Sequence, residues 1–379
     1  MNTKARVNGI QFFSITICFM LGTTLRTSHI NTILHNDAWM AAFTGALAYL
    51  PELFVLLALA GRYPGKNLFE INEAVFGNAA GRALSCVYLY FFITTLAVGV
   101  FDMGYFVVGF LMPEMPLPVV FSAFILACGY AARKGFMPLA RVSTLLALGA
   151  FLTIMTSLLL SIPNMRMRYL LPMLTFPPMR YVQGTHVSAT ICFGETIVFL
   201  ALPPMLGREG GIKKPLLITA AVTTLVVFLL QIRSTLTLGP ILPYVANPSY
   251  ETIRLIDIDT VFTRLESIYA LILVSLTFFR ACTLLHASAT GIAHVGRVEE
   301  SHGPGSHGPI MLLTCGLCVV YALRAFHSYA DSQAWAVSTS PFLLTAVEFV
   351  LPMLTLLTSW IRGAAGAGHG KLLRGGARE

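Results

Sequence analysis

The sequence predicts an all-α integral membrane protein of about ten transmembrane helices, arranged as two inverted repeats of five. Composition is the first observation: the chain is 56% hydrophobic and 11% charged, with a mean hydropathy of +0.75, whereas soluble domains carry about 25% charged residues. Second, apolar runs near the ~20 residues that cross a bilayer recur along all 379 residues. Third, a six-residue pattern at Ser14–Phe19 returns at Ser188–Phe193, half a chain later.

The apolar runs divide the chain evenly. In order, the expected spans cover residues 9–28, 38–60, 84–111, 117–132, 142–163, 183–206, 215–239, 266–290, 310–330 and 341–361. The first five form repeat one (9–163) and the last five repeat two (183–361), within a single transmembrane domain of residues 1–362. The second set of five is expected to repeat the first upside down. The Gly-rich basic segment 363–379 is expected to be a flexible tail.

The positions of Lys and Arg predict the orientation in the membrane. With the N-terminus inside, 16 of the 25 basic residues fall in cytoplasmic connections, seven, including Arg26, in outer connections, and Arg233 and Arg280 within spans. Cytoplasmic connections carry the excess of basic residues, so both termini are expected in the cytoplasm. The net charge of +8 then reflects topology, and we expect no nucleic-acid partner.

The residues that usually mark metal or catalytic sites are not grouped as such sites require. All seven cysteines lie in apolar spans, which argues against a disulfide framework. Cys315 and Cys318 have the CxxC spacing, but no second ligand pair accompanies them, so they are interpreted as packing residues. The sequence contains no P-loop and no H-E-x-x-H motif. We expect no metal, no cofactor and no enzymatic activity.

The repeated pattern leads, in both halves, into residues that weaken a helix. Corresponding glycine-interrupted spans in two halves indicate the substrate site of inverted-repeat transporters. Unwound backbone in a membrane is tolerated only where it lines a cavity or is buried in protein, and its freed amides and carbonyls suit the carboxylate and ammonium of an amino acid. The predicted ligand site comprises Gly22, Thr23, Thr24, Phe193, Gly194, Glu195 and Thr196. The alternative is that these small residues only permit close helix packing.

Glu195 is the most informative single residue of this set. A charged side chain at mid-membrane costs ~3 kcal/mol on insertion scales, so it is by default a functional hypothesis. Glu195 is expected to contact a ligand ammonium or to take up a proton during switching. The alternative is a structural ion pair with Arg280 or Arg233.

Four further charged residues fall within the expected spans. Glu52 follows Pro51, which opens the helix locally, and Glu52 and Arg280 are candidates for gating or for an ion pair. Glu348 is expected either to pair or to extend toward the interface. Asp102 lies in the outer third of its span, where a solvated position is expected.

Several motifs give the chain a family resemblance. Asp37-Ala38-Trp39 precedes a long apolar helix that ends before Pro64-Gly65-Lys66, and Gly194-Glu195 opens another apolar run. With Ile256–Ile258 and Arg264–Glu266, these motifs resemble the B subunit family of the nutrient germinant receptors of bacterial endospores (GerAB-type). The resemblance covers most of residues 8–290, and the segment from Asp37 to Lys66 is its most specific part.

The resemblance implies the fold of the amino acid–polyamine–organocation transporters and a role in spore germination. It implies a small nutrient ligand such as an amino acid, an A-type membrane subunit and a lipoprotein C subunit as partners, and a place in the spore inner membrane. The alternative function is an amino-acid or organic-cation permease that carries out secondary transport. Proton-coupled relatives resemble one another in a lysine on the fifth helix. The fifth span of this chain contains no lysine, which argues against lysine-coupled transport. A purely structural scaffold is the third possibility.

Overall fold

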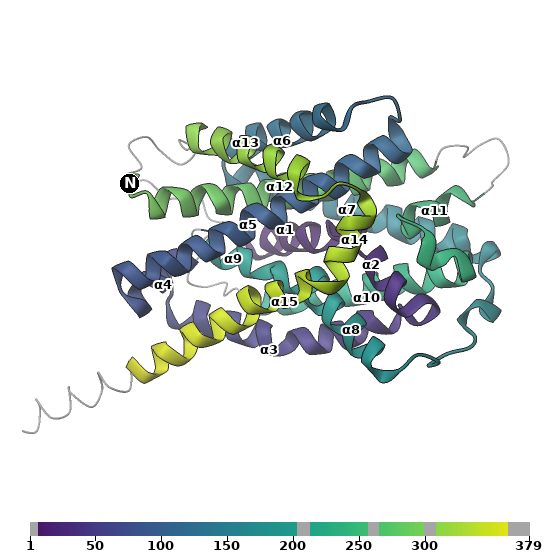
Figure 1. The fold of residues 1–379 in the computed structure, drawn as a ribbon, viewed down its shortest axis with the longest axis horizontal. Coiled ribbons are helices and arrows are strands. Elements are labelled where there is room, and N and C mark those ends of the chain that lie inside the picture. Colours follow the sequence, from purple (N-terminus) through teal and green to yellow (C-terminus); the bar gives the residue numbers. More distant parts are fainter. Residues whose placement is uncertain (1–6, 203–212, 257–264, 299–307, 363–379) are drawn as a thin grey trace, which may run out of the picture.

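The computed structural model describes residues 7–202, 213–256, 265–298 and 308–362, and this part of the chain contains helices and no strand. Within it, nine helices are long and apolar enough to cross a membrane, and Leu117–Arg133 is a shorter apolar helix. Most of these run roughly along the long axis of the molecule (Figure 1). They correspond one for one with the expected spans, which confirms the all-α membrane fold. The expected tail, 363–379, lies outside the described residues, as does part of the stretch matched to the family, 257–264.

The first five spans follow one another with a single long break, in span 1. Span 1 is α1 (Gly9–Leu21), η1 (Thr24–Arg26) and α2 (Ser28–Leu34); spans 2 to 5 are α3 (Met40–Arg62), α5 (Asn78–Phe106), α6 (Leu117–Arg133) and α7 (Phe136–Ser161). Helix α5 continues into a π-helical turn, η3 (Val107–Leu111).

The second five spans repeat this pattern. Span 6 is α8 (Pro178–Ser188), η6 (Ala189–Phe193), η7 (Gly194–Ile197) and α9 (Val198–Ala201). Spans 7 to 9 are α10 (Lys213–Leu238), α12 (Leu265–Val295) and α13 (Gly308–Ala325). Span 10 begins with α15 (Ser340–Thr345) and η9 (Ala346–Val350) and runs to Arg362. Spans 1 and 6, the first of each half, are the two with the predicted breaks.

Three connections hold short helices that the sequence analysis treated as parts of loops or spans: α4 (Leu68–Phe76), α11 (Pro248–Arg254) and α14 (Tyr329–Ser338). Helix α4 starts with a capping box, in which the Asn67 side chain accepts from Glu70 N at 2.9 Å and Glu70 Oε2 accepts from Asn67 N at 2.8 Å. Such caps stabilise a helix by about 1 kcal/mol. The preceding Pro-Gly-Lys motif turns the chain at Gly65, whose φ of +84° favours glycine.

Helix α1 lies in the middle of the bundle, packed on α7, α10 and α12 (Figure 1). Its C-terminal glycine permits a close approach to α12, because a Cβ at Gly22 would lie 2.9 Å from both Arg280 Cβ and Leu276 O. One large apolar core surrounds this contact. The two broken spans are therefore held next to the centre of the molecule.

Candidate functional site

The break in span 1 is a tight, internally hydrogen-bonded turn. Helix α1 ends at Leu21, and the chain turns through Gly22 and Thr23 into η1. The Thr23 hydroxyl donates to Met20 O at 2.7 Å, and the Thr24 hydroxyl donates to Leu21 O. The carbonyls expected to receive a ligand ammonium thus already accept from hydroxyls of the same turn. The charged group that this break places in the core is instead Arg26.

The break in span 6 is a change of helix type. The chain passes from the π-helical turn η6 to the 3₁₀ turn η7 between Phe193 and Gly194. Tyr49 of α3 holds this junction from one side, since its ring stacks on Phe193 with centroids 5.7 Å apart and its hydroxyl is hydrogen-bonded to Thr196 Oγ1. All four predicted residues from Phe193 to Thr196 are buried.

A network of buried ion pairs joins the two breaks. Arg26 NH1 donates to Glu195 Oε1 at 2.9 Å, and Arg26 Nε lies 3.4 Å from Asp102 Oδ2. Arg280 NH1 contacts the other Glu195 oxygen, Oε2. The four side chains are at most 5% exposed. Spans 1, 3, 6 and 8 therefore meet at one set of paired charges, which we call the ion network.

Of the two arginines considered as partners of Glu195, Arg280 is the one in contact. Arg233 lies elsewhere in the core, where NH1 donates to Ser157 Oγ at 2.7 Å and NH2 donates to Ser249 O at 3.0 Å.

Two expectations about this region are wrong. Arg26 was assigned to an outer connection, but span 1 continues as a helix to Leu34, so Arg26 is buried at mid-bundle and 4% exposed. Asp102 was expected to be solvated, but it is 5% exposed because Arg26 supplies a buried partner. The sequence did indicate that Arg26 and Asp102 could pair, because charged residues of opposite sign within apolar segments require partners.

Two further carboxyl groups lie against the break in span 6. A Cβ at Gly194 would overlap the Glu348 carboxyl group and would lie 3.2 Å from Glu52 Oε2. Glu348 is 1% exposed and Glu52 8% exposed, so Glu348 does not extend toward an interface. The sequence analysis named Glu52 as a gating candidate but left Glu348 out of the site.

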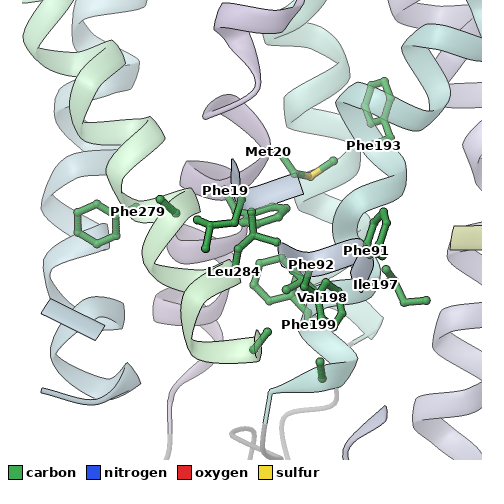
Figure 2. Close-up of a cluster of buried hydrophobic side chains, with 14 of the residues drawn as sticks. Phe19, Met20, Phe91, Phe92, Phe193, Ile197, Val198, Phe199, Phe279 and Leu284 are labelled. Carbon is green, nitrogen blue, oxygen red and sulfur yellow. The ribbon is translucent and has the colours of Figure 1, made fainter. Parts of the chain in front are cut away.

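An apolar layer separates the ion network from the N-terminal end of α1. The Phe199 ring packs edge-on against Phe12 and Phe19, with centroids 5.6 Å and 5.3 Å apart. Figure 2 shows Phe19 and Phe199 among side chains from α1, α5, α9 and α12. Arg280 lies over the Phe19 ring, 5.1 Å from its centroid. Apolar surroundings of this kind strengthen each ion pair and raise the cost of an unpaired charge.

The predicted site residues thus fall into two groups. Glu195 and Arg280 lie in the ion network, and Gly22 packs directly against Arg280. Gly194 faces Glu52 and Glu348, while Thr196 is bonded to Tyr49. Thr23 and Thr24 cap the end of α1.

The model of a family described as spore germination protein matches residues 6–330 of this chain. The chain belongs to this spore germination protein family. It is 26% identical over 293 residues to spore germination protein KB of Bacillus subtilis (strain 168), an alignment that covers 76% of this chain and 78% of that protein. It is 21% identical over 331 residues to spore germination protein YndE of the same organism, covering 85% and 87%.

Among solved structures, this spore germination protein is similar to Mhp1, a nucleobase-cation-symport-1 family transporter, in a closed conformation with bromovinylhydantoin bound. The TM-score is 0.60 at 12% identity, over 94% of this chain and 80% of Mhp1. This likeness shows a transporter-like fold of two inverted five-helix repeats. None of these names denotes an enzyme.

The structure also shows which contacts the Asp37 motif of this chain makes. Asp37 Oδ2 accepts hydrogen bonds from Leu174 N at 2.9 Å and from the Tyr181 hydroxyl at 2.7 Å. Leu174 belongs to the connector between the two repeats, and Tyr181 begins span 6. Asp37 therefore ties the start of span 2 to the link between the halves.

Proposed function

We propose that this chain is the membrane-embedded, nutrient-sensing B subunit of a spore germinant receptor. A small ligand, an amino acid, binds where spans 1 and 6 break, at Gly22, Thr23, Thr24, Phe193, Gly194, Glu195 and Thr196. The observation that carries the proposal is the contact between Arg26 and Glu195, because it links the two breaks through charges that a ligand can replace.

The chemistry of the ion network favours a zwitterionic ligand. The Glu195 carboxylate is shared between the guanidinium groups of Arg26 and Arg280. A ligand carboxylate can take the place of Glu195 on these arginines, and the ligand ammonium can then pair with the displaced Glu195. An amino acid brings both charges, so no buried charge is left unpaired, whereas a lone anion or cation leaves one, at a cost of several kcal/mol.

Such an exchange supplies a mechanism for sensing. With Glu195 released from Arg26, spans 1 and 3 are no longer tied to span 6, and a second arrangement of the helices becomes accessible. A ligand shifts this equilibrium only by its differential affinity for the two arrangements. The shift passes to an A-type membrane subunit and a lipoprotein C subunit in the spore inner membrane, with both termini of this chain in the cytoplasm.

The likeness to a ligand-bound transporter favours one second candidate, a permease for amino acids or organic cations. Both functions use the same site and differ in whether the ligand crosses the membrane. Uptake of a labelled amino acid into vesicles that contain the purified chain separates them, because a sensor binds without accumulating label inside.

The experiment that tests the proposal measures nutrient-triggered dipicolinate release from spores that lack this chain. The strain is complemented with the wild type, with Glu195→Gln, or with the control Glu251→Gln, whose side chain is in an exposed pair with Arg254. We expect the response to one nutrient to return with the wild type and the control and to fail with Glu195→Gln, at equal protein levels in the spore membrane. Release that is unchanged for every nutrient when the chain is absent would contradict the proposal.

A further inference from the structure

Glu52 and Glu348 are buried carboxyl groups without a paired cation among the residues that the structure describes. The two nearby arginines pair with Glu195 and Asp102 instead. Within the described part of the chain, Glu52 Oε1 and both carboxyl oxygens of Glu348 have no hydrogen-bond partner. An ionised carboxylate in this condition is strongly disfavoured, because burial removes its hydration and nothing replaces it.

The two groups lie close enough to interact. Both approach Gly194, and Glu348 lies within Coulombic range of Glu52. Like charges at such a site disfavour the ionisation of both groups. The ion network is already balanced, with two guanidinium groups against two carboxylates, so it leaves no spare positive charge for this pair.

An independent observation comes from α5. The Tyr88 side chain is fully buried, its hydroxyl has no hydrogen-bond partner among the described residues, and it lies within Coulombic range of Glu52. Three polar groups from α3, α5 and η9 are therefore gathered in the core with unused hydrogen-bonding capacity. Because buried polar groups are normally hydrogen-bonded, we expect this cluster to bind a ligand.

Glu348 packs directly against the Gly194 backbone, since a methyl group at Gly194 would overlap the Glu348 carboxyl group. A proton binds to such carboxyl groups without needing a cavity, and it removes the charge that burial disfavours. We propose that Glu52 and Glu348 form a proton-binding site, which holds at least one proton in this conformation and releases it when the Gly194 break opens.

The release of the proton would act on the break itself. Two negative carboxylates that both lie against Gly194 repel each other, and in a low-dielectric core this repulsion is only weakly screened. Because Gly194 has no side chain, only its backbone lies against the pair. Repulsion would then move η9 away from α3 and loosen span 10 from the break in span 6. Proton release and opening of the ligand site thus favour each other.

The elements packed against the pair carry other ionisable groups. They include Tyr49 on α3, Tyr88 and Asp102 on α5, His186 on α8, Cys192 on η6, Glu195 on η7 and Arg233 on α10, with Arg26 and Arg280 within Coulombic range of Glu348. Tyr49 and Glu195 are engaged by Thr196 and by the two arginines. The proton is therefore assigned to Glu52 and Glu348, whose carboxyl groups lack such partners in the described part of the chain.

Infrared spectroscopy of the full chain in lipid nanodiscs tests the proposal without any nutrient. At pH 7 an ordinary glutamate, with a pKa of ~4.3, is ionised. We expect the wild type to show the C=O absorption of a protonated carboxylic acid at that pH. Glu52→Gln and Glu348→Gln should each change this absorption, and the double variant should abolish it. The matched control Glu251→Gln, at an exposed ion pair, should leave it unchanged.

The outcomes are distinct from those of the germination experiment. Absence of the absorption in the wild type, or its persistence in the double variant, would overturn the proton site whatever the ligand is. If one variant does not fold, absence of the absorption in the wild type still overturns the proposal, and the single variant that folds shows whether its carboxyl group carries the proton. In complemented spores, the nutrient response of the wild type should vary with pH, and the response of Glu348→Gln should vary less. Loss of every nutrient response in a variant would concern only the proposed sensor function and would not change the infrared result.

Discussion

Arg26, from the break in span 1, donates to Glu195, from the break in span 6, at 2.9 Å and with both side chains nearly inaccessible to solvent. These residues are 169 positions apart in the chain. Their contact is the direct link between the two corresponding breaks of the inverted halves. It makes the spacing of the breaks depend on a charge pair rather than on apolar packing alone.

Removal of both partners of this pair should cost less than the sum of the two single removals. Arg26→Gln leaves one carboxylate of the ion network unbalanced, and Glu195→Gln leaves one guanidinium unbalanced. Breaking a buried pair in this way typically costs about 3–5 kcal/mol. The double variant leaves Arg280 and Asp102 balanced, so its loss should be smaller than the sum of the single losses by ~0.5–3 kcal/mol. The apparent Tm of the purified variants in nanodiscs measures these losses.

The exposed pair of Arg254 with Glu251 is the matched control. Its atoms are 3.0 Å apart, close to the 2.9 Å between Arg26 and Glu195, but its two side chains are 53% and 26% exposed. Surface pairs contribute about 0–1 kcal/mol, so Arg254→Gln and Glu251→Gln should change the apparent Tm little. Additive losses in the Arg26 and Glu195 cycle would show that the two side chains are not coupled.

Loss of the Asp37 carboxylate should free the connector between the repeats. Asp37→Asn removes the negative charge that accepts from Leu174 N and from the Tyr181 hydroxyl. Hydrogen bonds to charged groups contribute ~1.5–3 kcal/mol. Tyr181→Phe removes one of the two bonds and should have the smaller effect. Limited proteolysis of residues 165–177 should be fastest for Asp37→Asn, intermediate for Tyr181→Phe and slowest for the wild type. Equal rates in all three would contradict the tether.

The same connector should become less stable in weak acid. His35 lies between spans 1 and 2, and its ring packs on Phe176 with centroids 5.1 Å apart. Burial and the positive charge of Arg180 lower the pKa of His35, against a hydrogen bond to the Thr32 backbone that raises it. The folded protein thus binds this proton more weakly than the unfolded chain, whose histidine has a pKa of ~6.5. The contribution of His35 to the free energy of unfolding is therefore fully present above the pKa of the unfolded histidine and is lost as the pH falls below it.

His35→Asn removes the titrating group and keeps a residue type that tolerates the positive φ of 48° at this position. We compare proteolysis of the connector at about pH 7.5 and about pH 5.5, which lie on either side of the histidine pKa. Lowering the pH should increase proteolysis less in His35→Asn than in the wild type. An identical increase in both proteins would assign the acid sensitivity to another group.

The spans could be predicted because hydropathy and length decide them, and the breaks could be predicted because glycine and threonine interrupt an apolar run. The partners of the charges could not. Arg26 was placed outside the membrane because sequence alone does not show that span 1 continues as helix beyond its break. Once Arg26 is inside, Asp102 becomes a buried partner rather than a solvated residue.

Glu348 shows a second kind of limit. An acidic residue in the last span can pair, extend toward an interface or remain unpaired, and its own neighbours in the sequence do not distinguish these cases. The choice depends on Gly194, 154 positions earlier in the sequence, against which the Glu348 carboxyl group lies. Only the packing of span 10 on span 6 brings the two together.

That contact gives the sharpest test of the break in span 6. Gly194→Ala would place a methyl group onto the Glu348 carboxyl group and near Glu52. Overpacking of this kind costs about 1–3 kcal/mol. Gly99→Ala is the matched control, since Gly99 lies in α5 and a Cβ there would meet no atom of the described residues within 4 Å. Alanine is favoured over glycine in a helix interior by about 1 kcal/mol, so Gly99→Ala should be as stable as the wild type or more stable.

Adding Glu348→Ala to Gly194→Ala tests whether overlap with the Glu348 carboxyl group causes the loss of stability. Truncation at 348 removes the group that the new methyl would overlap, so the double variant should recover apparent Tm relative to Gly194→Ala alone. A loss that persists in the double variant would assign the cost to the backbone of the break instead. In complemented spores, Gly194→Ala should also abolish the nutrient response while Gly99→Ala preserves it. A normal response from Gly194→Ala would favour the scaffold interpretation, in which the break serves only helix packing.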